Sequence, residues 1–225
     1  MQVIGEVRRK MTDSKHILVL GATQGIGAKC VDRALTGGHR VRAFARSAGD
    51  MDPRPNLEPF PGDATKPEDL SAALDGVDAV IFALGIKESV AMLWQEVTLF
   101  SDATKALLPA MEDAGVARLI AVTGFGAGDS ANAMSRIERM GHRAILGKPY
   151  ADKDRQEELI RASNLDWTIA RPVILTNSSS PRGYKVLEDP KDWRNGLISR
   201  GDVADYAITA IEKNMNIRQA VVLSR

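Results

Sequence analysis

The chain has 225 residues, of which 44% are hydrophobic and 26% are charged, as is typical of a soluble globular domain. Thirty basic side chains against 29 acidic ones leave a formal net charge of +1, which excludes an overall field that would recruit nucleic acid or an anionic membrane. Cys30 is the single cysteine and the histidines are scattered, at positions 16, 39 and 142, so neither a disulfide nor a metal site is expected.

Residues 1–14 are expected to form a flexible N-terminal extension. They lack the apolar core of a signal peptide, and no apolar run in the chain is long enough to span a bilayer. We therefore expect a cytoplasmic protein in which residues 15–225 form one domain.

The first strand and helix enclose a glycine-rich turn. The apolar run 17–20 predicts a strand that is buried on both faces, and a helical pattern follows over about 26–35. Between them stand Gly21, Gly25 and Gly27. Such a turn presents backbone N–H groups at the positive end of the helix dipole, which favours a diphosphate. The alternative is that these glycines serve only a tight turn and helix packing.

A second strand is predicted over 40–45, and Arg46 and Ser47 follow directly. In a dinucleotide-binding fold the adenosine ribose lies at this point, and an acidic residue there would bind the 2′-hydroxyl of NAD. A guanidinium instead binds a 2′-phosphate through two hydrogen bonds, so the sequence favours NADP over NAD. The alternative for Arg46 is a solvated loop residue.

The middle of the chain alternates between strand and helix patterns. A weak strand over 57–61 ends in the sequence G-D-A at 62–64, and a short helix capped by Thr65 ends at Leu74. The remaining predictions for this part are a strand over 79–83 that breaks at Leu84-Gly85, a long helix over 90–114 that is kinked or broken at Pro109, and a strand over 119–122 that ends at Thr123.

The last part of the chain continues the alternation. We predict a helix over 150–163, a strand over 167–170 closed by Arg171-Pro172, an irregular segment over about 176–200, a helix over 201–213 and a strand over 220–223. Alternating strands and helices imply right-handed crossovers. The expected fold is therefore α/β: a doubly wound, mostly parallel Rossmann-type sheet with helices on both faces, in which the segment 176–200 covers a substrate.

Several short motifs occur in this order: G-A-T-Q-G-I-G at 21–27, Arg46, G-D-A at 62–64, A-L-G at 83–85 and D-W-T-I-A-R-P at 166–172. Together they resemble the short-chain dehydrogenase/reductase superfamily, and in particular its atypical NAD(P)H-binding branch, which is NmrA-like or biliverdin reductase B-like. Most members of that branch carry G-A-T-G, whereas Gln24 stands at the fourth position here. The resulting glycine spacing is that of the Tyr-x-x-x-Lys members of the superfamily.

The resemblance implies a set of cofactor-binding residues. They are Gly21, Thr23, Gln24, Gly25, Ile26 and Gly27 at the pyrophosphate; Arg46 and Ser47 at the 2′-phosphate; Asp63 and Ala64 at the adenine; Ala83, Leu84 and Gly85 at the adenine ribose; and Pro172, Val173 and Ile174 at the nicotinamide carboxamide. For Asp63, the alternative is a turn or cap residue.

The resemblance also implies catalytic candidates, because many superfamily members use a Ser or Thr together with Tyr-x-x-x-Lys. Thr123 matches the hydroxyl, and Lys153, which begins a K-x-x-x-E pattern, matches the lysine. The tyrosine position is Pro149, and Tyr150 lies one place late, about 100° further round a helix. Tyr150 would reach the site if the helix began after it. Lys153 is the stronger candidate, as a ribose or phosphate contact and as a proton donor; the alternatives are a structural Thr123 and a solvated Lys153.

Three functions remain open at this stage. The first is an NADPH-dependent oxidoreductase that reduces a flavin, a quinone or a small carbonyl compound, with the hydride chemistry supplied by the nicotinamide. The second is a non-catalytic NADP(H)-sensing regulator or assembly factor, which the offset tyrosine favours. A nucleotide-sugar epimerase or dehydratase ranks last, because it depends most on that tyrosine. The expected partners are a small-molecule substrate and either a second copy of the chain or another protein.

Overall fold

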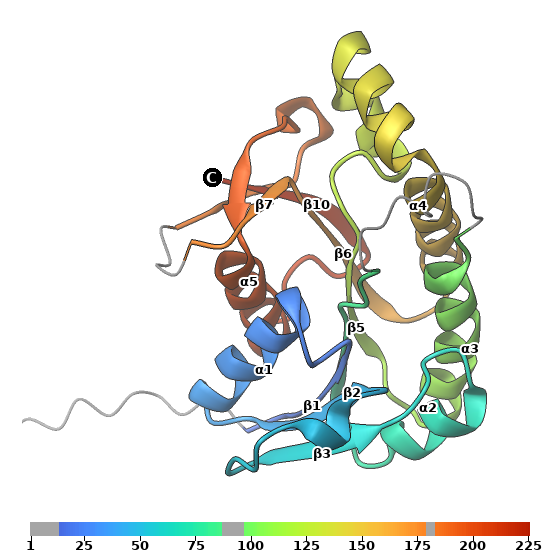
Figure 1. Cartoon of the computed structure of the whole chain (residues 1–225), viewed down its shortest axis with the longest axis vertical. Helices are drawn as coiled ribbons and strands as arrows, with labels where there is room; N and C mark the ends of the chain where they lie inside the picture. Colours follow the sequence, from blue (N-terminus) through green and yellow to red (C-terminus); the bar gives the residue numbers. More distant parts are fainter. Residues whose placement is uncertain (1–13, 87–96, 179–182) are drawn as a thin grey trace, which may run out of the picture.

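The computed structural model describes residues 14–86, 97–178 and 183–225 (Figure 1). The N-terminal extension expected over 1–14 therefore lies outside the described residues, except for Ser14.

Eight strands of the described residues form one sheet in the order β3-β2-β1-β4-β5-β6-β10-β8. All neighbours pair in parallel except β8, which is antiparallel to β10. The bounds are β1 His16–Leu20, β2 Arg40–Ala45, β3 Leu57–Pro61, β4 Ala79–Phe82, β5 Arg118–Val122, β6 Asp166–Pro172, β8 Lys185–Leu187 and β10 Gln219–Ser224. A separate parallel pair joins β7 (Ile174–Thr176) to β9 (Leu197–Ser199).

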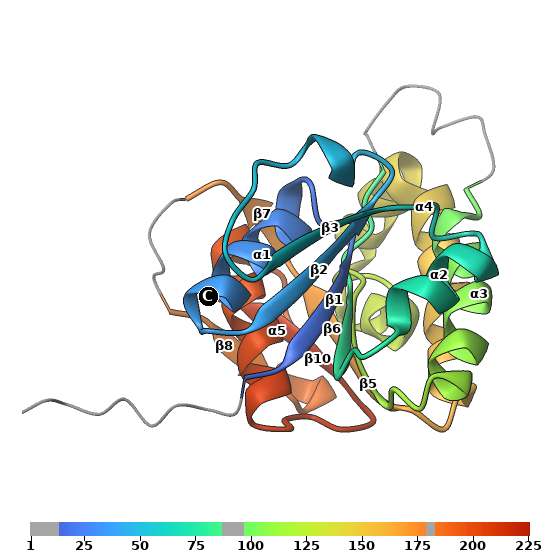
Figure 2. The same ribbon diagram turned by 90° about the horizontal axis from the view of Figure 1, so that it is seen from below.

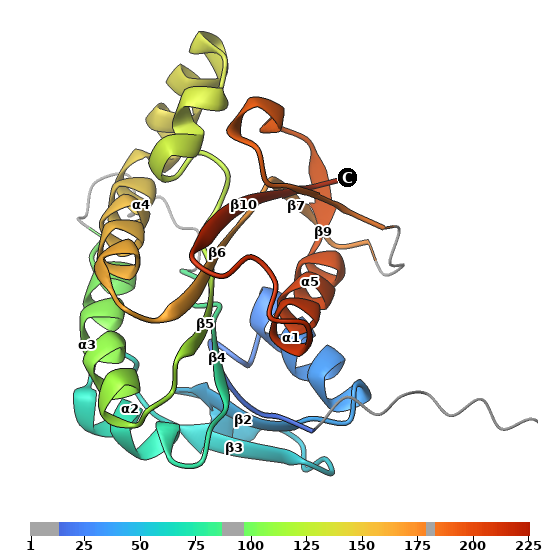
Figure 3. The same ribbon diagram turned by 180° about the vertical axis from the view of Figure 1, so that it is seen from behind.

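Helices cover both faces of the sheet (Figures 1 and 3). One face carries α1 (Gly25–Thr36) and α5 (Arg200–Glu212), and the other carries α2 (Pro67–Leu74), α3 (Leu99–Asp113) and α4 (Arg136–Ala162). The view from below shows the twisted strands between these two layers (Figure 2). The predicted α/β class, doubly wound and mostly parallel, is confirmed.

The uninterrupted apolar strands are explained by burial on both faces. In β1, Ile17 and Val19 pack into the core below α1 and α5, whereas Leu18 and Leu20 pack into the core below α2, α3 and α4. Successive side chains of a strand point to opposite faces, so a strand between two helical layers needs apolar residues at every position. The same alternation recurs in β4 and β5.

The prediction for the long helix is partly wrong. Residues 87–96 lie outside the described part, but residues 97 and 98 are not helical and α3 begins at Leu99. The helix also continues unbroken through Pro109 to Asp113. Pro109 is exposed, so the carbonyl that lacks its N–H partner faces the solvent side of the helix, where water can satisfy it.

The prediction for the next helix is wrong at its start. α4 begins at Arg136, not at Tyr150, and contains Pro149. A proline is favourable in the first turn of a helix, which made Pro149 resemble a starting point. The segment 176–200 is also more regular than expected, because β8, β9 and a short 3-10 turn over 190–192 lie within it. The other predicted elements differ from the observed bounds by at most two residues at either end.

Among the described residues, no helix is both long and apolar enough to cross a lipid bilayer. The cytoplasmic location expected from the sequence stays a prediction.

Candidate functional site

The turn after β1 is built by close backbone contacts that only glycine allows. Gly21 has a φ of +84°, and a Cβ placed there would lie 2.7 Å from the Ala83 carbonyl oxygen. A Cβ on Gly27 would overlap the carbonyl oxygen of Gly21. The start of α1 therefore rests directly on the turn, and the turn rests on the end of β4. Glycine at these two positions lets the backbone of the turn pack this closely, as a diphosphate-binding turn requires.

The N-terminus of α1 is available for an anion. Gln24 is the N-cap residue, but its side chain makes no capping hydrogen bond, and the first helical turn contains no acidic residue. The first N–H groups of a helix have no partner within the helix, and they carry the positive end of the dipole. A diphosphate fits both conditions.

Parallel pairing places the other predicted residues on the same edge of the sheet. Leu20, Phe82 and Ala121 are aligned across β1, β4 and β5, and β6 continues the row. The carboxyl ends of these strands therefore lead to the residues at 83–85, to Thr123 and to 172–174 (Figure 1). Ligands of such sheets bind outside the carboxyl ends of the strands, where the strand order reverses, which here is between β1 and β4.

The backbone beyond β6 is partly engaged within the protein. The Pro172 carbonyl accepts a hydrogen bond from Phe125 at 2.9 Å, and the Val173 N–H donates to the Leu223 carbonyl at 3.1 Å. Ile174 pairs with Leu197 across the β7–β9 ribbon, and its side chain is 57% exposed. The predicted contacts of these residues with a nicotinamide carboxamide stay predictions.

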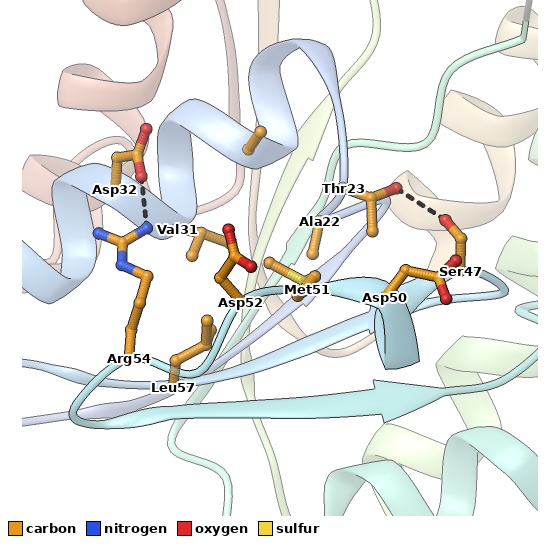
Figure 4. Close-up of a pocket in the computed structure, with 11 residues that line it drawn as sticks. Ala22, Thr23, Val31, Asp32, Ser47, Asp50, Met51, Asp52, Arg54 and Leu57 are labelled. Carbon is orange, nitrogen blue, oxygen red and sulfur yellow. Dashed lines mark hydrogen bonds and ion pairs between the residues drawn. The ribbon is translucent and has the colours of Figure 1, made fainter.

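The residues expected at the adenosine ribose lie near the end of β2. Arg46 and Ser47 are exposed, and the Ser47 hydroxyl donates to the Thr23 hydroxyl at 3.4 Å (Figure 4). The Asp63 carboxylate accepts hydrogen bonds from the Thr65 N–H at 3.0 Å and from the Thr65 hydroxyl at 2.8 Å. These hydrogen bonds, helped by the nearby Arg46 charge, lower the pKa of Asp63. Asp63 thus closes a turn before α2, and Ala64 beside it is buried.

A cavity of about 410 Å³ opens between α1 and the loop that joins β2 to β3 (Figure 4). Thr23 and Ser47 line it, and so do the side chains of Asp50 and Asp52. Arg54 also lines it, but is paired with Asp32 on α1 at 2.7 Å. Carboxylates this close to Ser47 oppose a bound phosphate, so the positive charge of Arg46 is needed for any preference for a 2′-phosphate.

Lys153 has a defined position at the end of β5. Its ammonium donates to the Thr123 carbonyl and lies over two aromatic rings, at 5.2 Å from the centre of Phe100 and 5.4 Å from the centre of Tyr150. Burial lowers the pKa of Lys153 to about 8, against the opposing charge of Glu157. A lysine with this pKa can hold and give up a proton near neutral pH.

Thr123 is held at its side chain as well. Its hydroxyl donates to Glu157 at 2.8 Å, and the same carboxylate accepts from Arg171 at 3.0 Å and 2.5 Å. The sequence alone predicts no role for Glu157 or Arg171. The spacing of Lys153 and Glu157 could have indicated a role for Glu157, because residues one helical turn apart lie on one face of a helix.

Tyr150 lies inside α4. The sequence placed it within reach of the site only if the helix began after it, and the helix does not. Its hydroxyl faces the backbone after β5, because a Cβ on Gly124 would lie 2.6 Å from it. Burial raises the pKa of Tyr150 to about 12. A catalytic role for Tyr150 stays a prediction, as does one for Thr123.

A family described as NAD(P)H-binding matches residues 21–214, which is more than half of the chain. The chain belongs to this NAD(P)H-binding family. A relative named as the uncharacterized sugar epimerase YhfK, from Bacillus subtilis strain 168, is 31% identical over 216 residues, covering 90% of this chain and 91% of the relative.

Two solved structures share the fold of this NAD(P)H-binding protein. The anaerobilin reductase ChuY of Escherichia coli O157:H7 has a TM-score of 0.75 at 24% identity, over 93% of this chain and 96% of that one. A short-chain dehydrogenase/reductase of Veillonella parvula DSM 2008, in complex with NADP, has a TM-score of 0.77 at 19% identity, over 94% of each chain. The resemblance to the atypical branch of the superfamily is thereby confirmed.

Membership of the NAD(P)H-binding family identifies the type of ligand, a nicotinamide dinucleotide. The residues present fit its diphosphate, because Gly21 and Gly27 allow the close-packed turn and the first turn of α1 has neither a side-chain cap nor an acidic residue. No group of three or more His, Cys, Asp or Glu side chains in the described ranges could hold a metal ion.

Proposed function

We propose that this protein is an NADPH-dependent oxidoreductase that reduces a flavin, a quinone or a small carbonyl compound. The observation that carries the proposal is Lys153, whose ammonium is anchored to Thr123 at the carboxyl edge, in line with the turn after β1. When bound, the nicotinamide supplies the hydride. The protein has to bind and orient the cofactor and the substrate and to supply one proton. Orientation alone can lower a barrier substantially, with effective molarities as high as roughly 10⁵ M or more.

The chain's residues divide this work along the edge of the sheet. The backbone over 21–27 would hold the diphosphate, and Arg46 with Ser47 would hold the 2′-phosphate. Lys153 would contact the nicotinamide ribose and give its proton to the reduced substrate. This second role is supported by its pKa of about 8, which keeps the ammonium protonated at neutral pH and still acidic enough to donate.

The direct test is NADPH oxidation by the purified protein with a flavin, a quinone and a small aldehyde as separate acceptors. We expect steady-state turnover with at least one of them, and loss of that turnover in Lys153→Met. If the protein binds NADPH but oxidises it with none of the three, it is not a reductase of these substrates.

A second function is supported by the state of Thr123. Its hydroxyl is taken by Glu157, and Pro149 stands where the superfamily's tyrosine is expected, so the site has few groups committed to proton transfer. This arrangement suits a non-catalytic NADP(H) sensor or assembly factor whose surface a protein partner would recognise. NADP-dependent capture of a partner by a protein without turnover would support it. An epimerase, the activity in the name of YhfK, ranks third because the Tyr150 hydroxyl faces Gly124.

The cofactor preference gives one prediction. We expect Arg46→Ala to weaken NADPH binding about tenfold, because a charge-assisted hydrogen bond to a phosphate is lost, and to leave NADH binding within about twofold. Calorimetric titration of both cofactors at low salt measures this. Arg54→Ala is the matched control, since Arg54 lines the same cavity but is paired with Asp32. An unchanged ratio of the two affinities in Arg46→Ala contradicts the proposed role of Arg46.

The pKa of Lys153 gives a prediction for the pH dependence of the reaction. Because the ammonium is the active form and its pKa is about 8, kcat/KM should be constant below that pH and fall about tenfold per unit above it. A profile from pH 6 to 10 measures the fall. Lys153→Arg keeps its charge over this range, so the falling limb should disappear even if the rate is lower. A wild-type profile that stays flat up to pH 9.5 is inconsistent with proton donation by Lys153.

A further inference from the structure

A line of charged side chains runs from the end of β5 to the molecular surface. It consists of Lys153 and Glu157 on α4, Arg171 at the end of β6, and Asp129 in the loop after β5. Its centre is buried: Arg171 is 0% exposed and Glu157 is 2% exposed. Asp129, at the outer end, is paired with Arg171 at 2.5 Å and is largely exposed.

The buried pair is tightly enclosed. A Cβ on Gly128 would lie 2.5 Å from the Glu157 carboxylate and 2.6 Å from the Arg171 guanidinium, and the guanidinium also lies over the Trp193 ring at 5.0 Å. Water is therefore kept from this pair. Burying two charges is expensive, and apolar residues of similar volume often give equal or greater stability. Stability alone thus gives a weak reason for an ion pair at this place.

Lys153 lies one helical turn from the Glu157 carboxylate of this pair. Lysine and glutamate four residues apart on a helix ordinarily attract each other. Here, within the described residues, Lys153 and Glu157 form no ion pair: Lys153 donates to the Thr123 carbonyl instead. Arg171 contacts both carboxylate oxygens of Glu157, and the Thr123 hydroxyl occupies one of them as well.

We propose that Arg171 is a positioning residue, which neutralises the Glu157 carboxylate by contacting both of its oxygens and so keeps the Lys153 ammonium at the Thr123 carbonyl, where it can reach the cofactor ribose. The inference rests on the proposed role of Lys153 at the cofactor. Without Arg171, the carboxylate one turn away would capture the ammonium and draw it toward α4. Thr123 contributes through two groups. Its carbonyl accepts a hydrogen bond from Lys153, and its hydroxyl donates one to the Glu157 carboxylate.

This mechanism predicts an asymmetry between the two members of the pair. Arg171→Met leaves a competing carboxylate, so NADPH binding should weaken about tenfold through the loss of the Lys153 contact. Glu157→Gln removes the competitor while still accepting from the Thr123 hydroxyl, so NADPH binding should stay within about twofold of the wild type. The double variant Arg171→Met/Glu157→Gln also lacks the competitor and should bind NADPH within about threefold of the wild type.

The measurement is calorimetric titration with NADPH, at a temperature well below the unfolding midpoint of every variant. Arg161→Met is the matched control, because Arg161 also pairs with Asp129, at 3.4 Å, but does not touch Glu157. It should bind NADPH like the wild type. If Arg171→Met cannot be obtained folded, Arg171→Lys serves, because one ammonium cannot hold both carboxylate oxygens in the way a guanidinium does. It should weaken binding in the same direction.

The inference is overturned if Arg171→Met, or Arg171→Lys in its place, binds NADPH like the wild type. It is also overturned if Glu157→Gln weakens binding as much as the arginine substitution does, since an ordinary structural pair would show that symmetry. A wild-type protein that binds neither NADPH nor NADH refutes the proposed function itself, and the positioning role with it. That result differs from a failure of the positioning role alone, because it is seen in the wild-type protein and needs no variant.

Discussion

The Gly21→Ala substitution is expected to abolish NADPH binding and to destabilise the fold by about 2–5 kcal/mol. Two effects combine at this position. A left-handed backbone with a φ of +84° is unfavourable by about 1–2 kcal/mol for a residue with a Cβ. The Cβ would also lie 2.7 Å from the Ala83 carbonyl oxygen, and overpacking of this kind typically costs about 1–3 kcal/mol. Relief of that contact would push the turn out of the shape that accepts a diphosphate.

Gly38→Ala separates these two effects. Gly38 has almost the same φ, +85°, but a Cβ there would have nothing within 4 Å. We expect it to lose only about 1–2 kcal/mol and to bind NADPH like the wild type. Urea unfolding gives the stabilities and calorimetry the affinities. Equal losses in the two variants, with binding retained in both, would mean that the contact between the turn and β4 is unimportant.

The Arg171→Met substitution should destabilise the protein by about 3 kcal/mol, because the buried Glu157 carboxylate loses its main partner and the Lys153 ammonium compensates its charge only in part. For a domain of this size, each kcal/mol lowers Tm by about 2–4 °C, so the expected fall is on the order of 10 °C. Thermal unfolding followed by circular dichroism measures it.

Two variants test the cause of that loss. Arg171→Met/Glu157→Gln should regain most of the stability, since it leaves no unpaired charge in the enclosed space. Arg161→Met should lose less than about 1 kcal/mol, because its ion pair with Asp129 is at the surface. A double variant as unstable as Arg171→Met would point to lost packing against Trp193 rather than to the incompletely compensated charge of the carboxylate.

Much of the fold could be predicted from the sequence because its strands are buried on both faces. In an α/β protein, an apolar run such as 17–20 predicts a strand that is buried on both faces, and the glycines after it mark where the strand ends. The errors came from prolines and from short strands. Pro109 does not break its helix because it faces solvent, and Pro149 lies within α4. The three-residue strands β8 and β9 depend on their partners and have too few residues to show a period.

The candidate site could be predicted as far as residues near one another in sequence allow. The Gly21–Gly27 turn follows from local spacing, and Thr123 and Lys153 from a known motif. The Glu157–Arg171 pair could not be predicted, because it joins an α4 residue to a β6 residue and its effect on Lys153 depends on which oxygens are filled. Cofactor contacts of all these residues remain predictions.

The position of Pro149 has a mechanical consequence. The first turns of α4 project beyond the edge of the sheet (Figure 1), whereas Lys153 and Glu157, further along the helix, contact Thr123 at the end of β5. Proline lacks the N–H that would bond to the carbonyl four residues earlier, so α4 lacks one backbone hydrogen bond between its first turns and Lys153. A force on the first turns of α4 would therefore bend the helix at Pro149. Lys153 would move less than it would in a helix without this proline.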